Sequence, residues 1–74
     1  MQQIYKTRHY MAKFSLKTGD IVQVLDFYGI PTKNGRVYFI DGDGNCFVES
    51  LTRNEETHKY DYIGCFAPYR LIRI

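Results

Sequence analysis

The sequence has no tryptophan, only two prolines and two cysteines, and no long apolar run. Its apolar stretches fall far short of the roughly 18–20 residues of a membrane-spanning helix, so we expect no membrane insertion. Residues 1–14 are studded with charges and lack the apolar core of a secretory signal. We therefore expect a cytoplasmic protein in which Cys46 and Cys65 are reduced, partly buried thiols.

Signatures of catalysis and of metal binding are also missing. Ser15 and Ser50 have no nucleophile motif around them, and neither histidine forms a recognisable signature with a serine or cysteine. The histidines and cysteines lack the close spacing of zinc ligands. A single domain of this length buries only about 60–65% of its unfolded surface, which leaves little room for an enclosed active site. We expect no enzyme activity, no cofactor and no metal ion.

The stretch "IDGDGNCFVE" contains the start of a calcium-loop pattern, with Asp41, Asp43 and Asn45 at its first, third and fifth places. A calcium loop of the EF-hand type also needs glycine at the sixth place and glutamate at the twelfth. These places hold Cys46 and Thr52. Two Asp-Gly pairs between apolar, alternating runs are instead typical of a hairpin turn, and we interpret the stretch as a turn between two strands.

The net charge of +2 is unevenly distributed along the chain. Residues 1–19 carry four basic residues and no acidic one, whereas residues 20–74 carry six basic residues against eight acidic ones. Electrostatic attraction for phosphate is therefore concentrated in the N-terminal arm. We predict that residues 1–13 form a basic, flexible extension and that residues 14–74 form the folded domain.

Five short runs have the composition or alternation of β-strands. In the first of them, Val22 and Val24 lie on one face, which predicts a strand that is buried mainly on that side. Five strands with no convincing helix indicate an all-β fold, a small closed or nearly closed barrel. The runs cover residues 21–27, 36–40, 46–51, 60–66 and 70–74.

The connections between these runs follow from turn chemistry. Residues 28–35, "YGIPTKNG", are predicted to be a loop, because Pro31 cannot donate to a ladder and Asn34-Gly35 favours a turn. Residues 52–57 are polar and separate the third run from the fourth. Ala67–Tyr69 predicts a short 3₁₀ turn before the last strand.

Residues 17–41 carry a family resemblance. A Gly-Asp turn, alternating valines, a glycine-containing loop and a Gly-x-Val element follow one another at Gly19, Asp20, Val22, Val24, Gly35 and Val37. This order resembles the opening of SH3-like barrels of the KOW type, although the loop is longer, Gly29 is only approximately placed, and Pro31 stands where a glycine is expected. The resemblance covers about a third of the chain. It implies a five-stranded SH3-like barrel and a role in the transcription or translation machinery, but such barrels host many functions.

Exposed aromatic residues favour a small, non-enzymatic module or regulator that docks on a protein partner. Phe27 and Tyr28 in the first loop, with Tyr60 and Tyr62 in the fourth strand, are residue types that dominate protein interfaces. The last run, "RLIRI", is a candidate strand edge for pairing with another chain, so we expect a monomer or a weak homodimer formed through a strand edge. The compact size also suits a modulator of the kind that phages and mobile elements encode.

The alternative is direct binding of RNA or single-stranded DNA. Basic residues interleaved with aromatic ones could contact the phosphate backbone and stack on bases. Against this, residues 20–74 are net acidic, whereas nucleic-acid-binding domains are usually strongly basic. The candidate residues are Lys6, Arg8, Tyr10, Lys13, Arg36, Tyr38, Arg53, Arg70 and Arg73.

Overall fold

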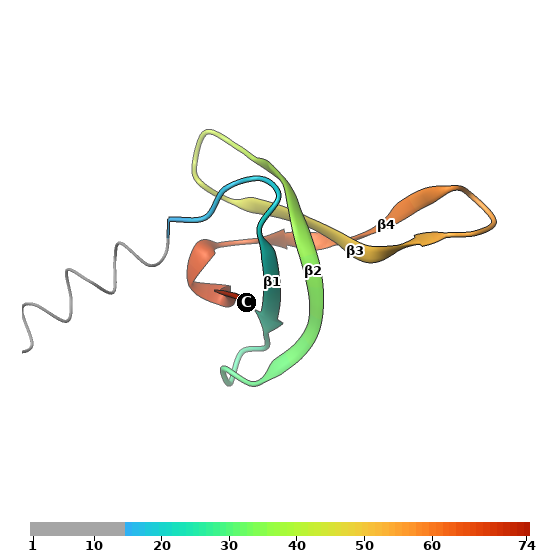
Figure 1. Ribbon diagram of the computed structural model, residues 1–74. Helices are drawn as coiled ribbons and strands as arrows, with labels where there is room; N and C mark the ends of the chain where they lie inside the picture. The colour runs from blue at the N-terminus through green and yellow to red at the C-terminus, as the bar shows by residue number, and fades with distance from the viewer. Residues whose placement is uncertain (1–14) are drawn as a thin grey trace, which may run out of the picture.

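The structure of the protein is a computed structural model that describes residues 15–74. These residues form one five-stranded antiparallel sheet with almost no helix (Figure 1). The elements are, in chain order, β1 (Ile21–Leu25), β2 (Pro31–Ile40), β3 (Cys46–Asn54), β4 (Lys59–Phe66), the 3₁₀ turn η1 (Pro68–Arg70) and β5 (Leu71–Arg73). The predicted all-β class is confirmed, and so is the 3₁₀ turn before the last strand.

The sheet is not closed into a barrel. Its strand order is β4-β3-β2-β1-β5, so β4 and β5 lie at opposite ends of it. Strands β1 to β4 follow one another as hairpins, and η1 then carries the chain across to place β5 beside β1. Strand β5 is only three residues long, and its observed ladder is with β1, where Leu71 lies opposite Val24. The expected closed or nearly closed barrel is therefore not confirmed: within residues 15–74 the strands form an open sheet in which β2 curves strongly (Figure 1).

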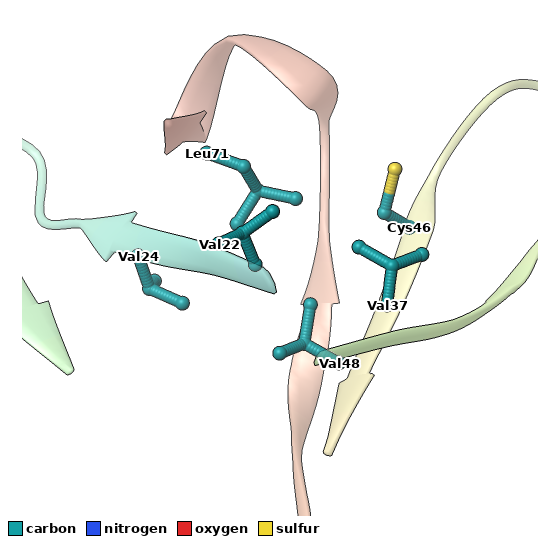
Figure 2. Packing of buried hydrophobic residues seen from close by; sticks show 6 residues of the cluster. All are labelled: Val22, Val24, Val37, Cys46, Val48 and Leu71. Atoms are coloured by element: carbon teal, nitrogen blue, oxygen red, sulfur yellow. The ribbon is translucent and has the colours of Figure 1, made fainter. Parts of the chain in front are cut away.

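The hydrophobic core lies on one face of this sheet. Strand alternation directs Val22 and Val24 of β1 to this face, as the sequence predicts. Leu16, Ile40, Ile63 and Phe66 pack against the core from its borders. Figure 2 shows its six buried side chains, Val22, Val24, Val37, Cys46, Val48 and Leu71.

Strand β2 begins earlier than the sequence predicts. The loop predicted over residues 28–35 rests on Pro31 and on the dipeptide Asn34-Gly35. Pro31 instead takes the first position of β2, opposite Leu25, where the ladder with β1 is irregular. A proline is tolerated there because the first residue of a strand need not donate to the ladder. Gly35 is buried inside the strand and makes no turn.

The predicted basic extension, residues 1–13, and Phe14 at the start of the predicted domain lie outside the described residues. No helix within residues 15–74 is long and apolar enough to cross a membrane. Four predicted nucleic-acid-binding residues also lie outside the described part, namely Lys6, Arg8, Tyr10 and Lys13.

Candidate interaction surfaces

The β1–β2 loop, residues 26–30, is held in a defined shape by Asp26. The Oδ1 atom of Asp26 accepts hydrogen bonds from the backbone N–H groups of Tyr28, at 2.8 Å, and Ile30, at 2.9 Å. Two backbone hydrogen bonds close the same turn, from Asp26 N–H to the Ile30 oxygen and from Gly29 N–H to the Asp26 oxygen. Gly29 has a φ of 79°, which glycine adopts without steric cost. The loop is thus preorganised by its own side chain.

This loop presents large apolar side chains to solvent. Phe27 is 91% exposed, Tyr28 87% and Ile30 57%. These side chains are exposed although the loop is ordered, since its backbone is held by hydrogen bonds to the Asp26 side chain and within the turn itself. The predicted exposure of Phe27 and Tyr28 is confirmed. Ile30 was missed, although an isoleucine just before a proline, in the same loop as Phe27 and Tyr28, was a signal for it.

Arg70 links this loop to η1. Its Nε–H donates to the carbonyl oxygen of Leu25 at 2.8 Å, at the end of β1. Its guanidinium carbon lies 5.1 Å from the ring centroid of Phe27 and 5.7 Å from that of Phe66. This geometry is that of a cation–π contact between Arg70 and the largely exposed Phe27 ring. Arg70, predicted from the sequence as a nucleic-acid contact, is therefore engaged within the fold.

Strands β3 and β4 continue beyond the core as a two-stranded arm (Figure 1). A bulge interrupts their ladder between the pairs Glu49–Tyr62 and Arg53–Tyr60. At the bulge, the Oγ atom of Ser50 accepts a hydrogen bond from the backbone N–H of Asp61 at 3.2 Å and donates to the Thr52 oxygen. The serine hydroxyl thus replaces a ladder partner. At the tip, Asn54 Oδ1 accepts from the N–H groups of Glu56 and Thr57.

Tyr60 and Tyr62 lie on this arm and not beside the β1–β2 loop. Tyr62 is 60% exposed, whereas the ring of Tyr60 is partly covered by the guanidinium of Arg36, 5.1 Å from the ring centroid. The β1–β2 loop and the arm lie at different ends of the molecule (Figure 1). The four predicted protein-binding residues therefore form two separate surfaces, because Phe27 and Tyr28 lie in the β1–β2 loop and Tyr60 and Tyr62 lie on the arm.

A third aromatic group lies at the β2–β3 ladder. The ring centroids of Phe39 and Phe47 are 5.5 Å apart, and those of Tyr38 and Phe47 are 6.3 Å apart, both in edge-to-face geometry. Such pairs stabilise the sheet through their quadrupoles. Tyr38 and Phe39 remain partly exposed. Tyr38, predicted to stack on nucleic-acid bases, thus has an aromatic neighbour inside the fold.

Arginine residues predicted to contact nucleic acid are largely engaged with the protein itself. Arg36 forms an ion pair with Glu49 at 3.3 Å, and Arg73 forms one with Asp20 at 3.5 Å. Arg53 is exposed on the arm. Residues 15–74 contain seven basic and eight acidic residues, so this part of the chain provides no excess of positive charge.

The stretch that begins a calcium-loop pattern is a turn between β2 and β3, as predicted. The carboxylate of Asp41 accepts hydrogen bonds from the N–H groups of Asp43 and Asn45, both at 2.9 Å. Gly44, with a φ of 88°, donates its N–H to the Asp41 carbonyl oxygen. The carboxylate that would bind a cation is thus directed at the backbone of its own turn. Within residues 15–74, no three His, Cys, Asp or Glu side chains form a group that could hold a metal ion.

We expect Asp41→Ala to destabilise the protein at neutral pH and to cost progressively less in acid. The hydrogen bond from the Asn45 backbone lowers the pKa of Asp41 below its ordinary value of 3.8. A group whose pKa is lowered by folding stabilises the fold above its unfolded pKa, and that contribution disappears as the pH falls through the folded pKa. Urea unfolding curves from neutral pH to below pH 3.8 should therefore show the two proteins converging.

The control for this comparison is Asp43→Ala. The carboxylate of Asp43 accepts no hydrogen bond from the described residues. Its removal should leave the unfolding midpoint almost unchanged. A constant difference between wild type and Asp41→Ala across the pH range would show that the Asp41 carboxylate does not stabilise the turn in its ionised form.

The two cysteines lie on different faces of the sheet. Cys46 is opposite Phe66 in the β3–β4 ladder, and Cys65 is opposite the neighbouring Phe47. Successive residues of a strand point to opposite faces, so the two thiols point away from each other and do not form a disulfide. Burial raises the pKa of the Cys46 thiol, which keeps it protonated in the core. Both thiols are free, as predicted, and Cys46 is buried, whereas Cys65 is exposed, so the predicted partial burial is wrong for Cys65.

The chain matches no protein-family model, no curated protein and no solved structure at a significant level.

Proposed function

We propose that this protein is a small, non-enzymatic interaction module that docks on a protein partner through the β1–β2 loop. The observation that carries the proposal is the exposure of three large apolar side chains on a loop whose backbone is fixed. A loop whose backbone is ordered before binding loses less conformational entropy on contact, and aromatic side chains contribute strongly to interface energies. Phe27 also contacts the guanidinium of Arg70.

We also propose that the sheet is an opened relative of the SH3-like barrels of the KOW type. Gly19 and Asp20 form a turn before β1. The N–H of Gly19 donates to the Val37 oxygen, and the Asp20 oxygen accepts from the N–H of Val37. Two further residues of the resembling motif, Val22 and Val24, are buried in the core. The resemblance extends the proposal to a partner in the transcription or translation machinery, or to a modulator role of the kind that phages and mobile elements encode.

Docking predicts that Phe27→Ser combined with Tyr28→Ser weakens partner binding at least about tenfold, because exposed aromatic residues at an interface centre each contribute strongly. A photo-crosslinking amino acid in place of Tyr28 should capture one discrete protein in cells, and the captured partner, once purified, provides the binding assay. The fold should be unaffected, since both side chains are almost fully exposed.

The control is Tyr62→Ser, which removes an exposed tyrosine from the arm instead of the loop. It should bind the captured partner with wild-type affinity. An equal loss in both variants would place the contact elsewhere and contradict docking through the loop.

Direct nucleic-acid binding is the competing function, and the excess of positive charge in residues 1–19 favours it. Fluorescence anisotropy with single-stranded RNA and DNA separates the two. Neutralised phosphates make log affinity fall with log salt at a slope of about −0.7 per contact for single strands. Salt-sensitive binding that Arg8→Ala with Lys13→Ala weakens, and that the Phe27 and Tyr28 changes leave intact, would replace the docking proposal.

A further inference from the structure

The edge of β4 is the longer and less protected of the two edges of the sheet. Strand β5, at the other end, has only three residues and follows Pro68. Strand β4 has eight residues, Lys59–Phe66, with no proline, and within residues 15–74 it pairs only with β3. An unblocked edge of this length is a template for another strand. The sequence pointed to the "RLIRI" end for such pairing, whereas the open sheet favours β4.

The backbone of the outer half of β4 offers its free hydrogen-bonding groups at Tyr60 and Tyr62. The N–H of Asp61 is directed toward β3, because it donates to Ser50 Oγ. In an antiparallel strand, the N–H and C=O groups of successive residues alternate between the two sides. Those of Tyr60 and Tyr62 therefore face the open edge.

Two charges of opposite sign favour a second copy of this chain as the partner, and they favour the register centred on Tyr60 over the one centred on Asp61. Lys59 and Asp61 are two residues apart, so they lie on the same face of β4, and both are exposed. Antiparallel pairing of two β4 strands about Tyr60 places Lys59 of each copy opposite Asp61 of the other. Pairing about Asp61 would instead place two carboxylates face to face, which is unfavourable. The edge is thus complementary to itself in the register centred on Tyr60.

We propose that a second copy of this chain docks on the β4 edge, in a two-fold symmetric, antiparallel pairing centred on Tyr60. The two sheets then form one continuous sheet, and the interface is isologous because each copy uses the same residues. The paired segment is short, so the dimer is weak and depends on concentration. This inference goes beyond the proposed function and uses a different surface from the β1–β2 loop.

The test is analytical ultracentrifugation of the full chain over a concentration series from micromolar to millimolar. Wild type should move reversibly from monomer to dimer. Lys59→Asp and Asp61→Lys should each raise the dimer dissociation constant about tenfold, because two cross-strand pairs change from opposite to like charge. An equimolar mixture of the two variants should recover wild-type dimerisation, since the two carboxylates of one variant then face the two ammonium groups of the other.

Matched controls carry the same charge changes away from the edge. Asp43→Lys lies in the β2–β3 turn and Lys33→Asp lies on β2, and both side chains are exposed. Neither should change dimerisation. A monomer at all concentrations, a dimer indifferent to both edge variants, or a mixture that fails to recover would each overturn the proposal. A dimer that neither edge variant weakens would have to form through another surface.

Amide hydrogen exchange of the wild-type protein alone is an independent test of pairing at the β4 edge. The backbone amide of Tyr60 should exchange with solvent more slowly as the protein concentration rises, because the dimer hydrogen-bonds it. Exchange at this amide that is independent of concentration would exclude the pairing centred on Tyr60. An extended segment of another protein bound there would protect the amide only when that protein is added.

Discussion

The Gly35→Ala variant is expected to lose about 1–3 kcal/mol of stability, a cost typical of overpacking a well-filled site. A Cβ atom at this position in β2 would contact the side chain of Val48 and lie 2.7 Å from the carbonyl oxygen of Glu49 and 3.0 Å from Cδ1 of Ile63. The Glu49 oxygen belongs to the backbone of β3 and cannot rotate away. Guanidinium unfolding followed by circular dichroism should show a lower midpoint.

The matched control is Gly42→Ala in the β2–β3 turn. A Cβ atom there meets nothing within 4 Å, and the backbone is not in the left-handed region. Its midpoint should stay at the wild-type value. If Gly35→Ala unfolded at that value as well, β2 and β3 could not approach each other as closely as the structure shows. A loss near the upper limit would take away a large fraction of the stability of a domain this small.

Gly35 also shows where sequence reasoning failed and why. The dipeptide Asn34-Gly35 is typical of a tight turn. The local pattern thus indicates correctly that position 35 needs a glycine, but it attributes that need to a turn. The glycine is required because the side chain of Val48 and the backbone of β3 occupy the space of a Cβ atom. That requirement comes from residues more than ten positions further along the chain, and no local pattern contains it.

The strands were predictable where one face is buried. Alternation identified Val22 and Val24, and their burial confirms it. In the arm, the outer ends of β3 and β4 are exposed on both faces, so the alternation disappears. Residues 52–54 of β3 were for this reason included in a polar connection.

The candidate surfaces likewise contain some features that the local sequence predicts and others that depend on long-range contacts. Exposure of Tyr28 followed from its place in a predicted loop, and that of Phe27 from its place next to this loop, although the first predicted strand ran on to Phe27 and β1 ends at Leu25. Asp26 is a turn residue whose role is local. The cover of Tyr60 by Arg36 and the contact of Arg70 with the loop depend on strand register and on the crossing at η1. Long-range geometry of this kind needs the folded structure.

Leu71→Ala is expected to lower the free energy of unfolding by about 2–5 kcal/mol, which is the usual cost of truncating a buried leucine. Leu71 is 1% exposed and lies in the core beside Val22 (Figure 2). It is the buried residue of β5, so the attachment of that strand depends on it. Chemical unfolding should show the loss, whereas Ile72→Ala, on the exposed face of the same strand, should have a small effect.

The same variant tests whether β5 stabilises the β1–β2 loop. Arg70 precedes Leu71, and it bonds to the Leu25 oxygen and stacks on Phe27. Weaker attachment of β5 in Leu71→Ala should therefore speed amide exchange in the β1–β2 loop under conditions where the protein is still folded. Exchange that stays slow at Tyr28 and Ile30 in Leu71→Ala would mean that Asp26 alone holds the loop, and that η1 adds nothing to its preorganisation.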